Sequence, residues 1–319
     1  MKKIIKNFLK SIESSHNKNK NLALLALPKF EGITLIDIGA AGDIEPRWKA
    51  IQANLNYIGF EPDERSRKEL LNKKSACRKY TIYEEAVSDS AGEISLNLCR
   101  KPQVSSVYKP NTELTNLFPD YKRFDVLSNE TIQTKKLDDI NIHNPDFVKL
   151  DIQGGELKAL LGGEKTLSET FGLEIEVEFL PLYIGQPLFG DITSFLSNKG
   201  FEFIDFVNLC RWERESHNGY GQCVFGDALY LKSPELVVNQ KLEDKRVSSY
   251  LSILLLYKRF DLIKRALELL PQAQRQNFSL FESRLKKIER SHNKARKISL
   301  LTNRLLRIFE TDSRNYLLY

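Results

Sequence analysis

Short apolar runs alternate with amphipathic stretches over the first two thirds of the chain. The apolar runs predict buried strands at 33–36, 57–60, 81–83 with 86–87, 147–150, 173–179, 201–207 and 228–231. The stretches between them predict helices at 46–53, 64–72, 156–167 and 191–199. Strands that alternate with helices in this way are typical of an α/β protein with a doubly wound, mostly parallel sheet.

Two further segments of this region have a pattern of their own. Residues 93–98 alternate between apolar and polar side chains and predict an additional strand. Residues 100–130 are polar, contain three prolines and show no regular period, which indicates a long excursion over the surface. Because such excursions often carry binding residues, this segment and residues 180–190 are candidates for acceptor binding.

The two ends of the chain show helical spacing without strands. Residues 2–27 predict a surface helix, and the apolar positions beyond Pro234 predict an appendage of about three to five helices. We therefore expect three parts, which are an N-terminal helical segment at 1–30, the α/β domain at 31–232 and a basic helical extension at 233–319.

The charge distribution supports the same boundary before the tail. The chain has a net charge of +6, but residues from 234 onward contain 18 Lys and Arg against 9 Asp and Glu, so the basicity belongs to the tail. No apolar run is long enough to span a membrane, and Lys6 and Lys10 interrupt any signal sequence. Four cysteines without metal-binding spacing suggest reduced, structural thiols, so we expect a cytoplasmic protein without structural zinc.

A glycine-rich turn follows the first predicted strand and has the sequence Asp37-Ile38-Gly39-Ala40-Ala41-Gly42. Glycine lets the backbone approach a ligand closely, so we expect Gly39, Ala40 and Gly42 to contact a cofactor. The spacing is not that of a dinucleotide fingerprint, and the chain has no phosphate-binding Gly-Lys-Ser/Thr. Asp37 can reach the amino-acid part of S-adenosylmethionine, or it can accept hydrogen bonds from the turn itself.

Two more acidic positions follow predicted strands at the spacing that an adenosine cofactor needs. Glu61 ends the second strand, 19 residues after Gly42, where a carboxylate can accept both ribose hydroxyls. Ser88 and Asp89 follow the third strand, and Asp89 is our candidate for the adenine amino group. The alternative for this segment is a tight turn that leads to Gly92.

The fourth and fifth strands end in carboxylates that can face an acceptor. Asp151 follows the fourth strand and is our candidate for the catalytic base, with His143 second. Glu156 is either a second catalytic group or a cap on the next helix. Glu176 and Glu178, near the end of the fifth strand, are candidate acceptor contacts.

Together these motifs resemble the FkbM family of S-adenosylmethionine-dependent methyltransferases. The resemblance runs from Ile33 to Leu231 and rests on an ordered set of motifs: Asp37-Ile-Gly-Ala-Ala-Gly42, Gly59-Phe-Glu-Pro62, Ala86-Val-Ser-Asp89 with Gly92, Leu137-Asp138, Phe147-Val-Lys-Leu-Asp151 with Gly154 and Glu156, Glu176, and Pro181-Leu-Tyr-Ile-Gly-Gln-Pro-Leu-Phe189. It implies a class I methyltransferase (Rossmann-like) fold and O-methylation of a hydroxyl on a sugar, glycan or natural product. Tyr183, in the last of these motifs, joins Glu176 and Glu178 as a candidate acceptor contact.

The chain departs from the family pattern at two positions. Ala41 stands where family members commonly have Asn, although Arg47-Trp48 fits a subset of the family. Gln153 replaces a Glu, which removes one carboxylate and weakens the case for a divalent metal beside S-adenosylmethionine. The tail after Pro234 lies outside the resemblance.

Two other functions compete with this interpretation. The basic tail can bind phosphates in a nucleic-acid methyltransferase, although charges that alternate with apolar positions are typical of a solvated helix face. The fold can also serve as a scaffold without catalysis, with the tail as a partner-binding or homodimer surface. The intact Asp37, Gly39 and Glu61 favour an enzyme with a small-molecule or glycan acceptor.

Overall fold

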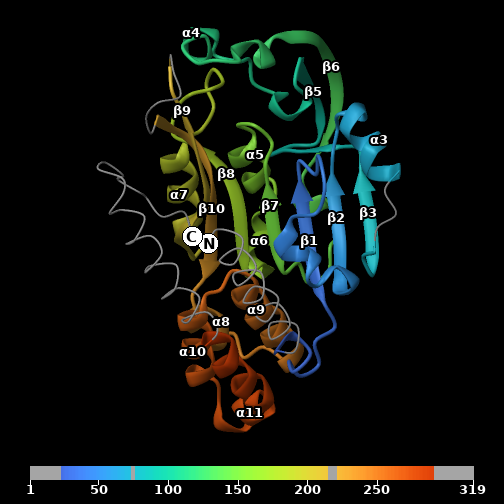
Figure 1. The fold of residues 1–319 in the computed structure, drawn as a ribbon. Helices are drawn as coiled ribbons and strands as arrows, with labels where there is room; N and C mark the ends of the chain where they lie inside the picture. The colour runs from blue at the N-terminus through green and yellow to red at the C-terminus, as the bar shows by residue number, and fades with distance from the viewer. Residues whose placement is uncertain (1–22, 73–75, 215–220, 291–319) are drawn as a thin grey trace, which may run out of the picture. The chain divides into compact units, whose positions relative to one another are not determined.

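A seven-stranded sheet forms the centre of the protein (Figure 1). The computed structural model describes residues 23–72, 76–214 and 221–290. The strands of the sheet, in spatial order, are β3 (Lys79–Tyr83), β2 (Leu55–Phe60), β1 (Ile33–Ile38), β7 (Phe147–Leu150), β8 (Gly172–Glu178), β10 (Gln222–Lys232) and β9 (Phe201–Trp212). The first five are parallel, whereas β10 is antiparallel to β8 and to β9. The predicted α/β fold with a mostly parallel sheet is confirmed.

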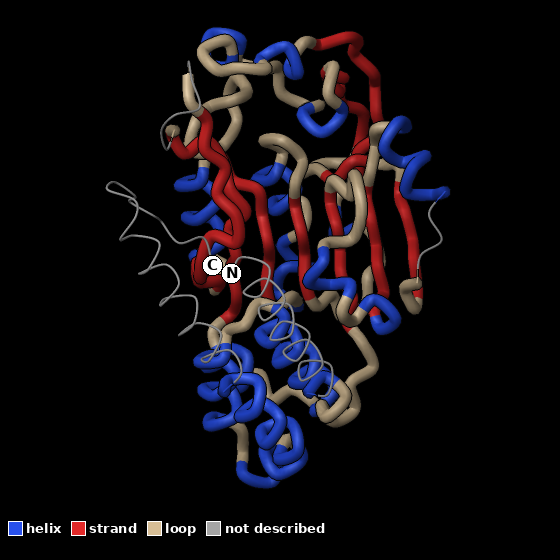
Figure 2. The backbone as a smooth tube through the Cα atoms, in the orientation of Figure 1, coloured by secondary structure: helices blue, strands red, loops and turns tan. Residues whose placement is uncertain are grey.

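Helices connect the strands and flank the sheet (Figure 2). In the α/β region these are α2 (Pro46–Lys49), α3 (Glu64–Asn72), α4 (Thr112–Thr115), α5 (Glu156–Leu161), α6 (Glu164–Glu169) and α7 (Phe189–Asn198), with short 3-10 turns η1 (Gln52–Asn54), η2 (Pro102–Val104), η3 (Tyr121–Phe124) and η4 (Leu137–Asp139). One face of the sheet is apolar and packs against α5, α6 and α7 through residues such as Leu150, Leu160 and Leu196. This packing forms the main core.

The other face of the sheet carries charged residues among its apolar ones. Trp48 of α2 packs on Phe147, with ring centroids 5.1 Å apart. Beside this contact, the strand register aligns Asp37 with Lys149 and Lys149 with Glu174. Successive residues of a strand point to opposite faces, so these three side chains form a polar row across three strands.

A second, three-stranded sheet is inserted between β3 and β7 in the sequence. It has the order β4 (Ala86–Val87), β6 (Val126–Lys135) and β5 (Gly92–Cys99). Residues 93–98 therefore form a strand, as predicted. The segment 100–130 is only partly irregular, since it contains η2, α4, η3 and the start of β6. The sequence did not predict β6. Residues 126–131 are all exposed and mostly polar, so they do not show the alternation of apolar and polar residues that marks a half-buried strand.

Three predicted elements are divided in the structure. Residues 46–53 form α2 and part of η1, while 81–83 and 86–87 belong to different sheets. The helix predicted at 156–167 is α5 followed by α6, with a break at Gly162 and Gly163. A Cβ atom at Gly162 would lie 1.9 Å from the carbonyl oxygen of Ser88, so the backbones meet there. Periodicity alone cannot show such a contact.

Helices dominate the C-terminal region, as predicted. They are α8 (Pro234–Asn239), α9 (Asp244–Leu256), α10 (Phe260–Leu269), α11 (Gln272–Asn277) and a helix over residues 279–290. By its contacts the chain divides into two compact units, one of residues 32–237 and one that joins the N-terminal residues through 31 to residues from 238 onward. In the second unit, Ser248 Oγ donates to the Pro28 carbonyl oxygen at 2.5 Å.

The helix predicted at 2–27 lies mostly outside the described residues. Within the described parts of the chain, no helix combines the length and the apolar character needed to cross a membrane.

Candidate active site

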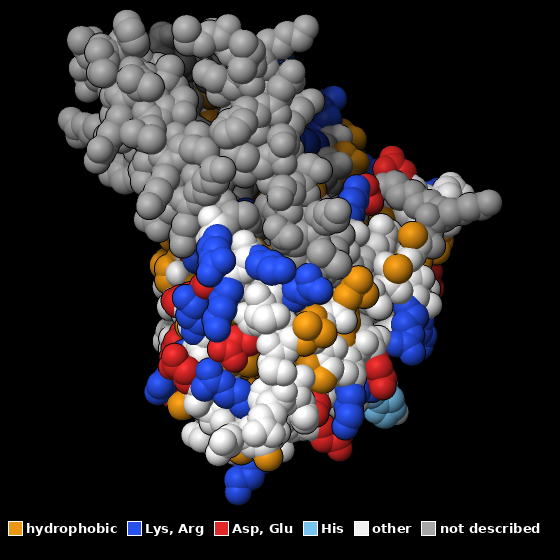
Figure 3. Space-filling view, turned by 60° about the horizontal axis from the view of Figure 1, so that its bottom comes forward, with side chains coloured by type: hydrophobic (Ala, Val, Ile, Leu, Met, Phe, Trp, Pro, Cys, Tyr) orange, Lys and Arg blue, Asp and Glu red, His pale blue; other side chains and the backbone are white. Residues whose placement is uncertain are grey.

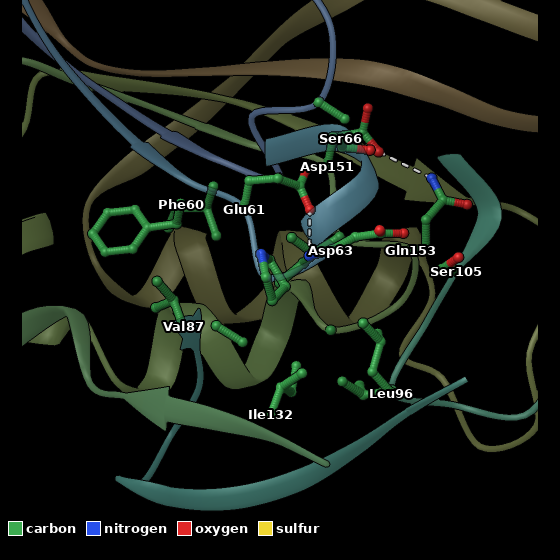
Figure 4. A pocket seen from close by; sticks show the side chains of 18 of the residues that line it. Phe60, Glu61, Asp63, Ser66, Val87, Leu96, Ser105, Ile132, Asp151 and Gln153 are labelled. Atoms are coloured by element: carbon green, nitrogen blue, oxygen red, sulfur yellow. Dashed lines mark hydrogen bonds between the residues drawn. The ribbon is translucent and has the colours of Figure 1, made fainter. Parts of the chain in front are cut away.

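A pocket lies at the carboxyl ends of β1, β2 and β7, where open α/β sheets bind ligands. It encloses about 950 Å³, part of which is open to solvent. Figure 4 shows its side chains converging from the central sheet, the inserted sheet and the turn after β7. The lining consists of Ile38, Gly39, Ala41, Phe60, Glu61, Pro62, Asp63, Ser66, Ala86, Val87, Ser88, Ile94, Leu96, Pro102, Gln103, Ser105, Val107, Ile132, Thr134, Asp151, Ile152, Gln153, Gly155 and Lys158.

The glycine turn forms one corner of this pocket. The amides of Gly39 and Ala40 both donate to the carbonyl oxygen of Phe60 at 3.0 Å, which joins the turn to β2. Gly39 has a φ of +82° and lines the pocket. Ala40 is buried and Gly42 is exposed, and the lining includes neither of them. The structure thus brings Gly39, with Ala41, to the pocket.

Glu61 enters the pocket from the end of β2 and is nearly buried. Its Oε1 accepts a hydrogen bond from the amide of Asp63 at 2.9 Å (Figure 4). Burial raises the pKa of Glu61 to about 7, a change opposed by the Asp63 amide. Asp63 and Ser66 also line the pocket, and sequence reasoning missed both. Asp63 could have been predicted, because it is an acidic residue only two positions after the strand-end carboxylate of Glu61.

An apolar wall closes the pocket opposite the acidic residues. Ile94 and Leu96 of β5 and Ile132 of β6 form it, so it comes from the inserted sheet (Figure 4). The sequence does not show this wall, because no local pattern indicates that β5 and β6 turn their apolar side chains toward the pocket. Ser88 lines the pocket, whereas Asp89 is exposed and accepts hydrogen bonds from Ser88 Oγ and Ser90 Oγ.

Asp37 lies on the charged face of the sheet rather than in the pocket lining. Its Oδ2 accepts a hydrogen bond from the Tyr57 hydroxyl at 2.7 Å, and Lys149 Nζ lies 3.7 Å from its Oδ1. Burial raises the pKa of Asp37, while Lys149 and Tyr57 oppose this change. Burial alone would lower the pKa of Lys149, but the carboxylates of Asp37 and Asp151 outweigh it and raise that pKa above its usual range.

Asp151 connects the pocket with a row of carboxylates on the same face. It lines the pocket, and its backbone amide donates to the Ile38 carbonyl oxygen at 2.9 Å. Glu176 of β8 lies beside it, and the register pairs Glu176 with Asp227 of β10. Burial, and to a smaller extent the charge of Asp151, raises the pKa of Glu176 well above its usual value. The same two causes raise the pKa of Asp227 to about 6. Asp227 is a further acidic residue that sequence reasoning did not single out.

The remaining predicted residues lie around this row. Glu178 is buried, and burial together with Glu156 raises its pKa well above the ordinary value. Tyr183 is fully buried, and its hydroxyl lies 2.8 Å from Gln153 Oε1. Glu156 is buried at the start of α5, where its Oε1 accepts a hydrogen bond from the Ile152 amide at 2.8 Å. This contact ties Glu156 to the turn before α5, which has no side-chain cap hydrogen bond, and both alternatives for Glu156 stay predictions.

The sequence matches the family model described as "Methyltransferase FkbM domain" over residues 42–203. This match covers half of the chain. The chain belongs to the FkbM methyltransferase family. The matched model is that of a methyltransferase domain, and membership in the family implies S-adenosylmethionine as the methyl donor. The order of the strands agrees with the class I methyltransferase fold that the sequence motifs implied.

Individual relatives of this family member are distant. It is 26% identical over 164 residues to the 2-O-methyltransferase NoeI of Sinorhizobium fredii, an alignment that covers 48% of this chain and 66% of NoeI, just under two thirds. The solved FkbM methyltransferase of Methylobacillus flagellatus KT is 16% identical with a TM-score of 0.38, covering 63% of this chain and 44% of the other. The solved precorrin-6y C5,15-methyltransferase of Geobacter metallireducens GS-15 is 12% identical with a TM-score of 0.32. That match covers 67% of this chain and 88% of the other.

Proposed function

We propose that this methyltransferase transfers the methyl group of S-adenosylmethionine to a hydroxyl of a sugar, glycan or natural product. The observation that carries the proposal is the position of Asp151, which lines the pocket together with Gly39 and Glu61 and also adjoins the carboxylate row. One carboxylate thus stands between a site for the donor and a site for a polar acceptor. The similarity to NoeI, a 2-O-methyltransferase, supports an oxygen acceptor.

The residues present fit the donor. Glu61 can accept hydrogen bonds from ribose hydroxyls, and the apolar wall of Ile94, Leu96 and Ile132 can cover a purine ring. Gly39 lines the pocket without a side chain, so a ligand can approach its backbone closely. When bound, S-adenosylmethionine supplies a methyl carbon that is electrophilic because sulfur carries a positive charge. We propose Gly39, Glu61, Asp63 and Ser88 as its contacts, with Asp37, Ala40, Gly42 and Asp89, which lie outside the lining, as less direct ones.

Asp151 acts as the base in this proposal. The acceptor oxygen forms a bond to the methyl carbon while the carbon–sulfur bond breaks and leaves its electron pair on sulfur. The hydroxyl proton passes to the Asp151 carboxylate. Glu176, Glu178 and Tyr183 orient the acceptor, directly or through neighbouring groups, since alignment of the reacting atoms supplies most of the rate in such displacements. Among the described residues, no three His, Cys, Asp or Glu side chains are arranged to hold a metal ion.

An Asp151→Asn variant tests the proposal. Donor affinity is measured by calorimetry with S-adenosylmethionine, and transfer is measured with methyl-labelled donor and extracts of the source cell, treated or untreated with glycan-removing enzymes. We expect the wild type to bind the donor and to label a glycan-sensitive fraction. We expect the variant to bind within about threefold of the wild type and to lose roughly 100-fold or more in turnover.

Two results would contradict the proposal. If the wild-type protein fails to bind the donor, it cannot transfer the methyl group, and the proposed function is wrong. Turnover of the variant within a few-fold of wild type would remove Asp151 from the chemistry.

The described part of the helical C-terminal region, residues 234–290, does not favour a nucleic-acid acceptor. Lys264 pairs with Glu289 at 2.6 Å, and Arg275 pairs with Glu282 at 3.3 Å. Figure 3 shows Lys and Arg side chains beside Asp and Glu side chains on the face that it presents. Mixed charges of this kind are typical of solvated helices, whereas phosphate binding favours a continuous basic surface.

A further inference from the structure

Gln153 lies between two carboxylates in the turn after β7. Its side-chain amide donates to Asp151 Oδ1 at 2.9 Å and also to Glu176 Oε1 (Figure 4 shows Gln153 beside Asp151). On its other side, Gln153 Oε1 accepts from the Tyr183 hydroxyl at 2.8 Å. The backbone of Gln153 has a φ of +58°, which a residue other than glycine rarely adopts.

The orientation of this amide follows from its neighbours. An amide oxygen turned toward Asp151 and Glu176 would face two acceptors, so the NH₂ group must point to them. The Tyr183 hydroxyl then shares its hydrogen between Gln153 Oε1 and the Val104 carbonyl oxygen, which is 3.0 Å away. All hydrogen-bonding groups of the Gln153 side chain are therefore engaged.

The same turn is tied to the inserted sheet. Ser106 Oγ donates to the carbonyl oxygen of Gln153 at 2.6 Å, and the Ser106 side chain is buried. Ser106 itself forms a backbone bridge with Asn97 of β5. The sheet that supplies the apolar wall of the pocket thus holds the backbone that carries Gln153.

We propose that Gln153 is a positioning residue that fixes Asp151 for proton removal from the acceptor. Two neighbouring carboxylates repel each other and ordinarily need a cation or a shared proton. The uncharged amide supplies a donor to each of them and so holds the two side chains beside each other, in addition to Lys149, whose Nζ lies 4.0 Å from Asp151 Oδ2. This inference rests on the proposed O-methyl transfer, in which Asp151 is the base.

Gln153→Leu removes both donors at nearly constant volume. With the acceptor fraction labelled by the wild type, we expect the turnover number to fall roughly 10- to 100-fold while donor affinity stays within about threefold. We also expect the acid limb of the rate profile to move to higher pH, because a carboxylate without its donor binds protons more readily. Gln133→Leu is the matched control, since Gln133 donates to Glu93 at 2.9 Å on the exposed side of the inserted sheet.

Gln153→Glu gives a second test that needs no acceptor. It places a third carboxylate between Asp151 and Glu176. We expect its melting temperature to fall more steeply than that of the wild type between about pH 5 and 8, because the three charges repel once ionised. Manganese(II) should restore the melting temperature of this variant and leave the wild type unchanged, since carboxylate oxygens are suitable ligands for this ion.

The outcomes separate the two proposals. A turnover number of Gln153→Leu equal to that of the wild type would overturn the role of Gln153. The same would follow if pH and manganese changed the melting temperatures of Gln153→Glu and the wild type equally. Wild-type protein that labels no acceptor would overturn the proposed function instead. In that case the melting comparison still decides whether the amide separates the two carboxylates.

Discussion

The carbonyl oxygen of Asp151 lies 1.9 Å from the position that a Cβ atom would take at Gly39. The turn after β1 and the end of β7 are therefore in backbone contact, and the pocket corner and the candidate base are built as one piece. Any side chain at residue 39 must push this contact apart. The pocket corner and the carboxylate proposed as the base consequently depend on the same glycine.

Gly39→Ala is expected to destabilise the fold and to abolish donor binding. The added Cβ meets backbone atoms, and the φ of +82° is unfavourable for alanine, so we expect a loss of about 3 kcal/mol in the free energy of unfolding. Gly42→Ala is the matched control. It has a φ of +103° but nothing within 4 Å of the added atom, so we expect a loss of only about 1 kcal/mol. Urea unfolding compares the two, and equal losses would contradict the contact.

Donor affinity should depend on the ionisation of Glu61. With a pKa of about 7, the Glu61 carboxylate that we propose for the ribose hydroxyls is fully ionised only above neutral pH. We expect donor affinity in the wild type to rise about tenfold from pH 6 to pH 8. In Glu61→Gln this rise should be absent, with weaker binding at pH 8. Glu64→Gln, at the exposed start of α3, is the control that should keep the wild-type profile.

The same group affects stability in the opposite direction. The folded protein holds the Glu61 proton more tightly than the unfolded chain does. The resulting stabilisation is complete below the unfolded pKa of about 4.5 and is lost as the pH rises through about 7. We expect this loss, roughly 3 kcal/mol, to be missing from the pH dependence of unfolding in Glu61→Gln. A variant whose unfolding free energy fell as steeply as that of the wild type would contradict the raised pKa.

The ion pair between Arg47 and Glu174 should contribute to stability. Arg47 reaches from α2 to the charged face of the sheet, 3.1 Å from a Glu174 carboxylate that is 4% exposed. Arg47→Met removes the cation beside a buried charge, so we expect a loss of about 3 kcal/mol in thermal or urea unfolding. Lys49→Met removes a cation from the exposed pair with Asp43, for which we expect less than about 1 kcal/mol. Similar effects of the two changes would show that the buried pair has no special role.

Gly162 should be required where α5 meets the pocket segment. Gly162→Ala places a Cβ atom 1.9 Å from the Ser88 carbonyl oxygen, and Ser88 lines the pocket. We expect a loss of about 2–3 kcal/mol in stability and a weaker affinity for the donor. Gly190→Ala, in α7 with open space around the added atom, is expected to raise stability by about 0.5 kcal/mol. Calorimetric melting and donor titration of both variants provide the comparison.

Local patterns were sufficient for much of the fold. The strands β1, β2, β7 and β8 were predicted because each carries a run or a close alternation of apolar residues in the chain. The positions of Gly39 and Glu61 at strand ends also follow from the sequence, since a strand–turn–helix order places these ends at one edge of the sheet. These features depend on spacing along the chain, which the sequence contains.

Features that depend on distant contacts were decided only by the tertiary structure. The close approach of Ser88 to Gly162 joins segments that are far apart in the chain, and the apolar wall exists because β5 and β6 fold back over the ends of the central strands. The bridge from Gln153 to Asp151 and Glu176 joins residues whose pairing no periodicity reveals.

Short-range patterns of side-chain type in the sequence predict most of the strands and helices, the glycine turn and the acidic strand ends. Packing in three dimensions sets which of those carboxylates share a face, brings both Glu61 and Asp151 to the pocket and places an uncharged amide between Asp151 and Glu176. Those outcomes depend on strand order and on long loops that close in space. Their physical cause is packing between segments that are remote in the chain.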